Sequence, residues 1–115
     1  MAKLITKAHM TKLLANGAKS KDDPDFTAKP VIKLFNPVGA GTWLLSELDP
    51  NNPDIAYGLA DLGAGEPELG YLSIKELSSV RLRFGLTIER DLHFTGDKTI
   101  REYAREARAA GKIVY

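Results

Sequence analysis

The chain has 115 residues, of which 43% are hydrophobic and 27% charged, and its sixteen basic and fifteen acidic side chains nearly cancel. These values are typical of one folded domain, here residues 1–115, and they argue against a disordered, fibrous or coiled-coil protein. The near-neutral charge removes a general attraction to nucleic acid or an anionic membrane, and no apolar run is long enough to span a bilayer. Because there is no cysteine for a disulfide or a thiolate site, we expect a cytoplasmic protein.

The N-terminal part of the chain predicts an amphipathic helix over 7–16, begun by Thr6 as its cap. Three apolar residues at helical spacing form its packing face: Met10, Leu13 and Leu14. The pair Asn16-Gly17 is typical of a helix C-terminus, since both residues tolerate the left-handed conformation. The polar residues 18–30, with two prolines, then predict a long surface loop.

The centre of the chain predicts an antiparallel meander of three strands separated by turn residues. The expected strands are 31–35, 42–48 and 55–62. On the third strand, large residues alternate with small ones such as Ala56 and Gly58. The small face indicates a close neighbour, most simply a packed helix.

The C-terminal half predicts two further strands and two capped helices. A short strand over 69–72 leads into Ser73-Ile74-Lys75-Glu76, which matches a capping box at the start of a two-turn helix. A charged turn over 81–85 precedes an alternating segment, 86–94, that predicts a long strand. A second capping box, 99–102, begins the C-terminal helix.

This order of elements predicts an α+β fold. It comprises an N-terminal helix and an antiparallel sheet of four to five strands. A short central helix and a C-terminal helix pack on one face of that sheet.

Alternate residues of the predicted last strand, Glu89, Asp91 and His93, place two carboxylates and an imidazole on one polar face. Such a set can bind a metal or transfer protons, but alternating charge is also ordinary on a solvated strand face. No second histidine cluster completes a metal site, and we predict no catalytic residue, metal ligand or cofactor. Together with Arg81 and Arg83 of the charged turn, these residues are candidates for partner binding.

A second set of residues suits nucleic acid. Aromatic residues that lie one to a strand can stack bases, and arginines on the last helix can contact phosphates. The residues are Trp43, Tyr57, Tyr71, Arg101, Arg105 and Arg108. Strand aromatics are more often part of a core, so both interpretations stay open.

Six segments of the chain resemble one bacterial family, domain of unknown function 2958. They read LITK (4–7), PVIKLF (30–35), GTW (41–43), DIAYGL (54–59), ELGYLS (68–73) and GLTIERDLHF (85–94). Where the family usually reads VRGPxGL, this chain has Val80-Arg81-Leu82-Arg83, so the tight Gly-Pro turn is absent and one positive charge is added. The resemblance implies a small cytoplasmic protein of plasmids, phages or other mobile elements, with no assigned activity.

From these observations we expect a non-enzymatic interaction protein encoded by a mobile element, which binds and inhibits a host defence or nucleic-acid-processing protein. One alternative is a DNA- or RNA-binding accessory protein that uses the sheet aromatics and the arginines. A second alternative is a small metal-dependent hydrolase built on the polar strand face.

Overall fold

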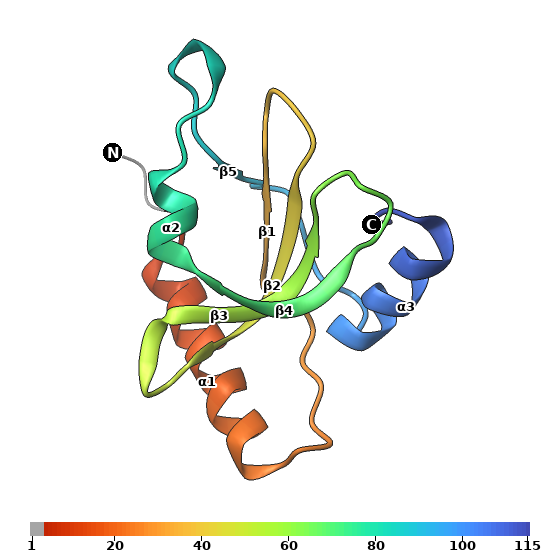
Figure 1. Ribbon diagram of the computed structural model, residues 1–115. Helices are drawn as coiled ribbons and strands as arrows, with labels where there is room; N and C mark the ends of the chain where they lie inside the picture. Colours follow the sequence, from red (N-terminus) through yellow and green to blue (C-terminus); the bar gives the residue numbers. More distant parts are fainter. Residues whose placement is uncertain (1–3) are drawn as a thin grey trace.

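A five-stranded antiparallel sheet with helices on both faces organises this computed structural model, which describes residues 4–115 (Figure 1). The strands lie side by side in the order β4-β3-β2-β1-β5. In chain order the elements are α1 (Lys7–Asp22), β1 (Ile32–Phe35), β2 (Thr42–Asp49), β3 (Asn52–Asp61), β4 (Glu68–Ser73), α2 (Ile74–Ser79), η1 (Arg83–Gly85), β5 (Glu89–Arg90) and α3 (Ile100–Ala110). The α+β prediction is therefore confirmed.

Strands β1 to β3 form the predicted meander of three strands, and β4 extends it by pairing with β3. The connection between β2 and β3 is tighter than expected, because β3 begins at Asn52 and not at Ile55. The Asp49 carboxylate accepts a hydrogen bond from the Asn51 backbone N–H at 2.9 Å, which closes the turn locally. A bulge between Leu45 and Glu47 interrupts the β2–β3 register.

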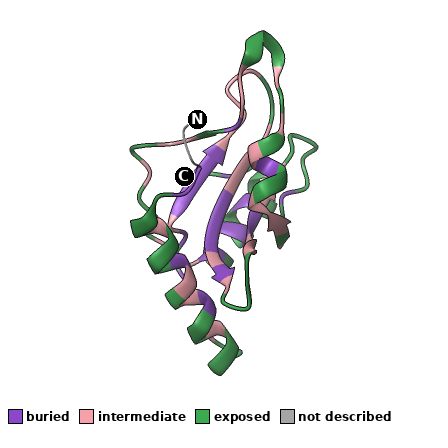
Figure 2. Ribbon diagram, turned by 90° about the vertical axis from the view of Figure 1, so that its left-hand side faces the viewer, coloured by how far each residue is buried: buried purple, intermediate pink, exposed green. Residues whose placement is uncertain are grey.

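The two faces of the sheet are covered by different helices. One core combines Leu13 of α1 and Leu77 of α2 with residues of β1 and β2, including Leu45. The other core combines α3 with Leu44 and Leu59. The two later helices thus lie on opposite faces rather than on one, because adjacent residues of β2 point to opposite sides. Figure 2 shows the buried residues concentrated on the strands, whereas the helices expose their outer sides.

Helix α1 continues to Asp22, so the predicted stop at Asn16-Gly17 was wrong. Gly17 is buried inside the helix, and a Cβ at this position would lie 1.9 Å from the Leu48 carbonyl oxygen. The Asn16 side-chain amide donates to the Ser46 carbonyl at 2.9 Å. Both residues are therefore explained by the close approach of α1 to β2 and not by a helix end.

The small face of β3 has a different neighbour from the one expected. A Cβ on Gly58 would lie 2.0 Å from the Leu44 carbonyl oxygen, so the close approach at this position is to the backbone of strand β2. Ala56, two residues earlier, is buried in the core that contains α2. The expectation of a packed helix therefore fails at Gly58.

Strand β5 is much shorter than the predicted strand over 86–94. Only Glu89 and Arg90 pair with β1, opposite Phe35 and Leu34. The Asp91 backbone N–H still donates to the Lys33 carbonyl at 2.9 Å, but the Asp91 side chain then accepts from the His93 N–H at 2.8 Å. This side-chain turn diverts the chain from the sheet, so residues 89, 91 and 93 do not share one strand face.

Of the two capping boxes predicted in the second half of the chain, the one at α3 is complete, whereas the one at α2 has only the bond from Glu76 to Ser73 and lacks the return bond. Ser73 Oγ accepts from the Glu76 N–H at 3.1 Å at the start of α2. Thr99 Oγ1 accepts from the Glu102 N–H at 3.2 Å at the start of α3, and the Glu102 carboxylate accepts from the Thr99 N–H at 3.1 Å. None of the helices within residues 4–115 is both long and apolar enough to cross a membrane.

Candidate partner-binding site

The turn between α2 and β5, which projects at the top of Figure 1, contains an exposed aromatic residue. Phe84 is 84% exposed and has φ 62° and ψ 24°, in the left-handed region. Gly85 beside it has φ 71°. The Leu86 N–H donates to the Arg83 carbonyl at 3.2 Å, and the Leu82 N–H donates to the Leu86 carbonyl at 2.8 Å. We call residues 82–86 the Phe84 turn.

Local energetics disfavour phenylalanine at the tip of the Phe84 turn. Two adjacent residues of positive φ are the requirement of a type I′ hairpin turn, which favours Asn, Asp and Gly. A left-handed conformation costs a residue with a Cβ about 1–2 kcal/mol, and an exposed ring recovers little of this by burial. Among residues 4–115, Phe84 is the one residue other than glycine whose φ is positive. The turn therefore holds an apolar ring in water at an energetic cost.

The two arginines of the charged turn are held by backbone carbonyls. Arg83 Nη2 donates to the Val38 carbonyl at 3.2 Å, and its guanidinium carbon lies 5.8 Å from the centre of the Phe84 ring. Arg81 Nη1 donates to the Ser79 carbonyl at 3.4 Å. Because these acceptors carry no net charge, the two positive charges beside Phe84 are not neutralised by them.

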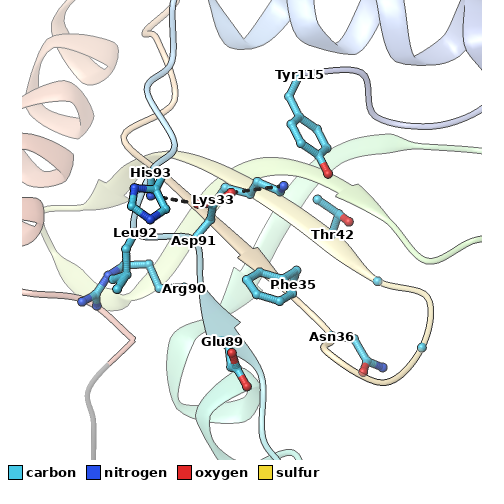
Figure 3. A pocket seen from close by; sticks show the side chains of 12 residues that line it. Lys33, Phe35, Asn36, Thr42, Glu89, Arg90, Asp91, Leu92, His93 and Tyr115 are labelled. Carbon is cyan, nitrogen blue, oxygen red and sulfur yellow. Dashed lines mark hydrogen bonds and ion pairs between the residues drawn. The ribbon is translucent and has the colours of Figure 1, made fainter.

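A recess of about 570 Å³ lies on the other side of the β1–β2 loop, and we call it the Lys33 pocket (Figure 3). It is lined by side chains of β1, of β5 and of the segment that follows β5, together with Tyr115. Asn36, Gly39 and Gly41 of the β1–β2 loop also line it, and Val38 of the same loop accepts the bond from Arg83. The Phe84 turn and the Lys33 pocket are therefore joined by this loop.

The Lys33 ammonium is the buried charge of the pocket. Lys33 is 5% exposed, and its Nζ lies 3.3 Å from Asp91 Oδ2. Its Nζ also lies 3.2 Å from the centre of the Tyr115 ring and 5.9 Å from that of Phe35, and Figure 3 shows Lys33 between these two rings. Cation–π contact with both rings and the ion pair with Asp91 together compensate for burying the charge.

Both oxygens of the Asp91 carboxylate accept hydrogen bonds. The His93 backbone N–H donates to Oδ1, and the Lys33 ammonium donates to Oδ2. The bond from His93, followed by the bond from Lys33, holds the pKa of Asp91 below its usual value, although partial burial acts in the opposite direction. Asp91 is thus ionised at neutral pH and fixes β5 against β1.

The candidate partner-binding residues fall into two adjacent groups. Glu89, Asp91 and His93 all line the Lys33 pocket, although as a turn and not as a polar strand face. Arg83 belongs to the Phe84 turn, and Arg81 immediately precedes it. Within residues 4–115 no group of three or more His, Asp or Glu side chains is placed to hold a metal ion.

The candidate nucleic-acid residues are only partly brought together. Trp43 packs against the core of the α1 and α2 face, whereas Tyr57 packs against the core of the α3 face. Tyr71 pairs with Tyr57 across β3 and β4, and their ring centres are 5.1 Å apart. Trp43 is therefore separated from Tyr57 and Tyr71, which form a pair on the α3 side of the sheet. The exposed residues of α3 include the three predicted arginines, Arg101, Arg105 and Arg108.

Three residues of the site were not identified from sequence. Lys33 had a signal, because it is the single charged residue in an otherwise apolar strand segment, VIKLF. Phe84 precedes a glycine in the charged turn, but no pattern reveals that its own φ is positive. Tyr115 has no sequence signal for its contact with Lys33, which depends on the packing of residues far apart in the chain.

Comparison with protein families identifies the family of this chain. A family model described as a protein of unknown function, DUF2958, matches residues 4–114. No curated protein and no solved structure gives a significant match. The match covers the sheet, all three helices and the candidate site except Tyr115.

Proposed function

This chain belongs to the family DUF2958 of proteins of unknown function, and we propose that it acts without catalysis, by binding another protein through the Phe84 turn. The observation that carries this proposal is the conformation of Phe84. An exposed aromatic residue in a disfavoured backbone conformation is a feature that fold stability does not explain. Such residues concentrate at sites where one molecule contacts another.

The residues around Phe84 have the composition of a binding site. Aromatic residues and arginine dominate the energetics of protein interfaces, typically as an apolar anchor with charged neighbours at its rim. Here Phe84 is the anchor, and Arg81 and Arg83 flank it. The Lys33 pocket, across the β1–β2 loop, adds a concave surface for a partner side chain. The exposed Leu92, which is 76% accessible, lies in the lining of this pocket and extends the apolar surface.

The proposed partner is a host defence or nucleic-acid-processing protein that is blocked when the Phe84 turn occupies its surface. The resemblance to a family of mobile elements supports this choice of partner. The absence of cysteine supports the cytoplasm as the place of the encounter. The unpaired charge of the two arginines suits an acidic rim around an apolar cleft on the partner.

The test is affinity capture from a nuclease-treated bacterial lysate with three forms of the protein. The unmodified protein should retain a specific protein, and Phe84→Gly should lose it. Tyr71→Ala, which removes an equally exposed aromatic ring elsewhere, should still retain it. The same captured protein with unmodified and Phe84→Gly baits would contradict the proposal, as would capture of nucleic acid alone.

The stability of the Phe84→Gly variant separates loss of binding from loss of folding. Glycine adopts positive φ without a steric cost, so the free energy of unfolding should rise by up to about 1 kcal/mol. A variant that is more stable and yet no longer binds identifies Phe84 as a recognition residue. If Phe84→Gly is destabilised, the ring has a structural role and the argument from strain fails.

A further inference from the structure

A row of positive charge runs along the exposed side of α3. Arg101, Arg105 and Arg108 are spaced four and three residues apart, which places them on one side of the helix over about 10 Å of its length. All three are exposed. The ion pairs formed by described residues join other side chains, and none includes these arginines. Like charges at this spacing repel each other, so the row is not a helix-stabilising arrangement.

An aromatic surface adjoins this row of arginines. Tyr71 of the edge strand β4 is 74% exposed, and its ring is tilted by 58° against that of Tyr57. Both tyrosines line a recess of about 190 Å³ together with Arg101. Arg101 and Arg108 are both close enough to Tyr57 to lower the pKa of its hydroxyl, although burial raises that pKa more strongly. The tyrosine pair and the arginine row therefore form one surface, which we call the α3–β4 face.

We infer that the α3–β4 face binds single-stranded nucleic acid, with phosphates on the α3 arginines and a base stacked on Tyr71. An exposed aromatic ring next to exposed arginines is the combination by which proteins bind single strands without sequence preference. A duplex does not fit this arrangement equally well, because its bases are already stacked and cannot present a face to Tyr71. An acidic protein would satisfy the arginines but has no specific use for the ring.

Acidic residues lie within and beside the α3–β4 face. Glu47, which lies opposite Tyr57 on β2, lines the same recess as Tyr57, Tyr71 and Arg101. Glu66 and Glu68 line a recess with Arg108, and Glu102 and Glu106 alternate with the arginines along α3. These carboxylates partly offset the positive charge of the arginines, so we expect binding to be measurable at low salt.

This inference is independent of the proposed function. Strand β4 forms one edge of the sheet and β5 forms the other, so the α3–β4 face and the Phe84 turn are at different ends of the molecule. A protein could bind at one end while nucleic acid binds at the other. Failure of either binding test leaves the other unaffected.

Fluorescence anisotropy with a labelled oligo(dT) strand tests the inference over a range of salt concentrations. With three phosphate contacts, the logarithm of the binding constant should fall with the logarithm of salt concentration with a slope of about −2. Replacing Arg101, Arg105 and Arg108 together by Gln should bring this slope close to zero. Replacing Arg81 and Arg83 by Gln, a matched loss of arginine at the other end, should leave the slope unchanged.

Substitutions of Tyr71 distinguish nucleic acid from any other polyanion. Tyr71→Ala should weaken oligo(dT) binding about fivefold or more without changing the salt slope, whereas Tyr71→Phe should retain the binding. Tyr71 is exposed, and unchanged thermal melting of both variants would confirm that they fold. The inference is overturned if oligo(dT) does not bind at low salt, if a duplex binds more tightly, or if polyglutamate binds as tightly and Tyr71→Ala has no effect. The last result would indicate an acidic protein partner.

Discussion

Replacing Gly17 by Ala tests the packing of α1 against the sheet, because helix propensity and packing predict opposite signs. In a helix interior, Ala is favoured over Gly by about 1 kcal/mol, so propensity alone predicts a more stable protein. In the structure, the new Cβ would lie 1.9 Å from the Leu48 carbonyl oxygen, whereas real Cβ contacts are at least 3.0 Å. Helix α1 would have to move away from β2 by about 1 Å.

The cost of that movement follows from the contacts that depend on it. A gap of this size removes a quarter to a half of the dispersion energy of each apolar contact it opens, including those of the buried Leu13. It also breaks the hydrogen bond from the Asn16 amide to the Ser46 carbonyl, at a cost of about 1 kcal/mol. The typical overpacking cost of about 1–3 kcal/mol and the lost hydrogen bond lower the free energy of unfolding, whereas the helix propensity of Ala raises it by about 1 kcal/mol. We therefore expect a net loss of stability of about 2 kcal/mol.

Urea denaturation followed by circular dichroism measures this loss directly. Ala18→Gly is the matched control, because Ala18 is the exposed neighbour of Gly17 and its substitution should cost only the propensity of about 1 kcal/mol. If Gly17→Ala leaves the protein as stable as before, or makes it more stable, then α1 does not approach Leu48 as described.

Two further predictions concern carboxyl groups. In a double-mutant cycle of Lys33→Met and Asp91→Asn, we expect a coupling free energy of about 1–2 kcal/mol at neutral pH. Because the pKa of Asp91 is lowered in the folded state, this coupling should be lost as pH falls below about 4, and a pH-independent coupling in chemical denaturation would contradict the ion pair. For Glu47, burial raises the pKa despite the opposing hydrogen bond with Ser20, so the folded state favours the protonated form and loses stability as pH rises above about 4.5. Glu47→Gln should therefore be more stable than the unmodified protein at pH 7 and equal to it below pH 4 in thermal melts, and equal stability at both pH values would show that Glu47 is not effectively buried.

Local patterns predicted those parts of the fold in which neighbouring residues decide the structure. Both helix starts in the second half of the chain were identified, because Ser73 and Thr99 accept from N–H groups three residues away. The meander followed from turn residues between β-rich segments. In each case residues close together in the chain define where the element begins.

Predictions failed where a distant residue decides the structure. Gly17 is typical of a helix end, but the Leu48 carbonyl, which lies beside it only in the folded protein, explains why a glycine is needed. The alternation over 86–94 suggested a long strand, but Asp91 binds Lys33 and the next turn instead of continuing the ladder. The site shows the same division, since its exposed charged residues were identified while the buried Lys33 and the conformation of Phe84 were not.

The strand order also determines how the chain reaches its folded state. Strands β1 to β4 pair through short connections, which cost little conformational entropy to close. Strand β5 pairs with β1 through contacts between residues far apart in the chain. In the Lys33–Asp91 ion pair, for example, the two residues are 58 positions apart. Non-local pairing of this kind is expected to form late and to open early, so weakening it should accelerate unfolding more than it slows folding. A partner bound across the Phe84 turn and the Lys33 pocket would hold this last-formed contact closed and lengthen the lifetime of the folded protein.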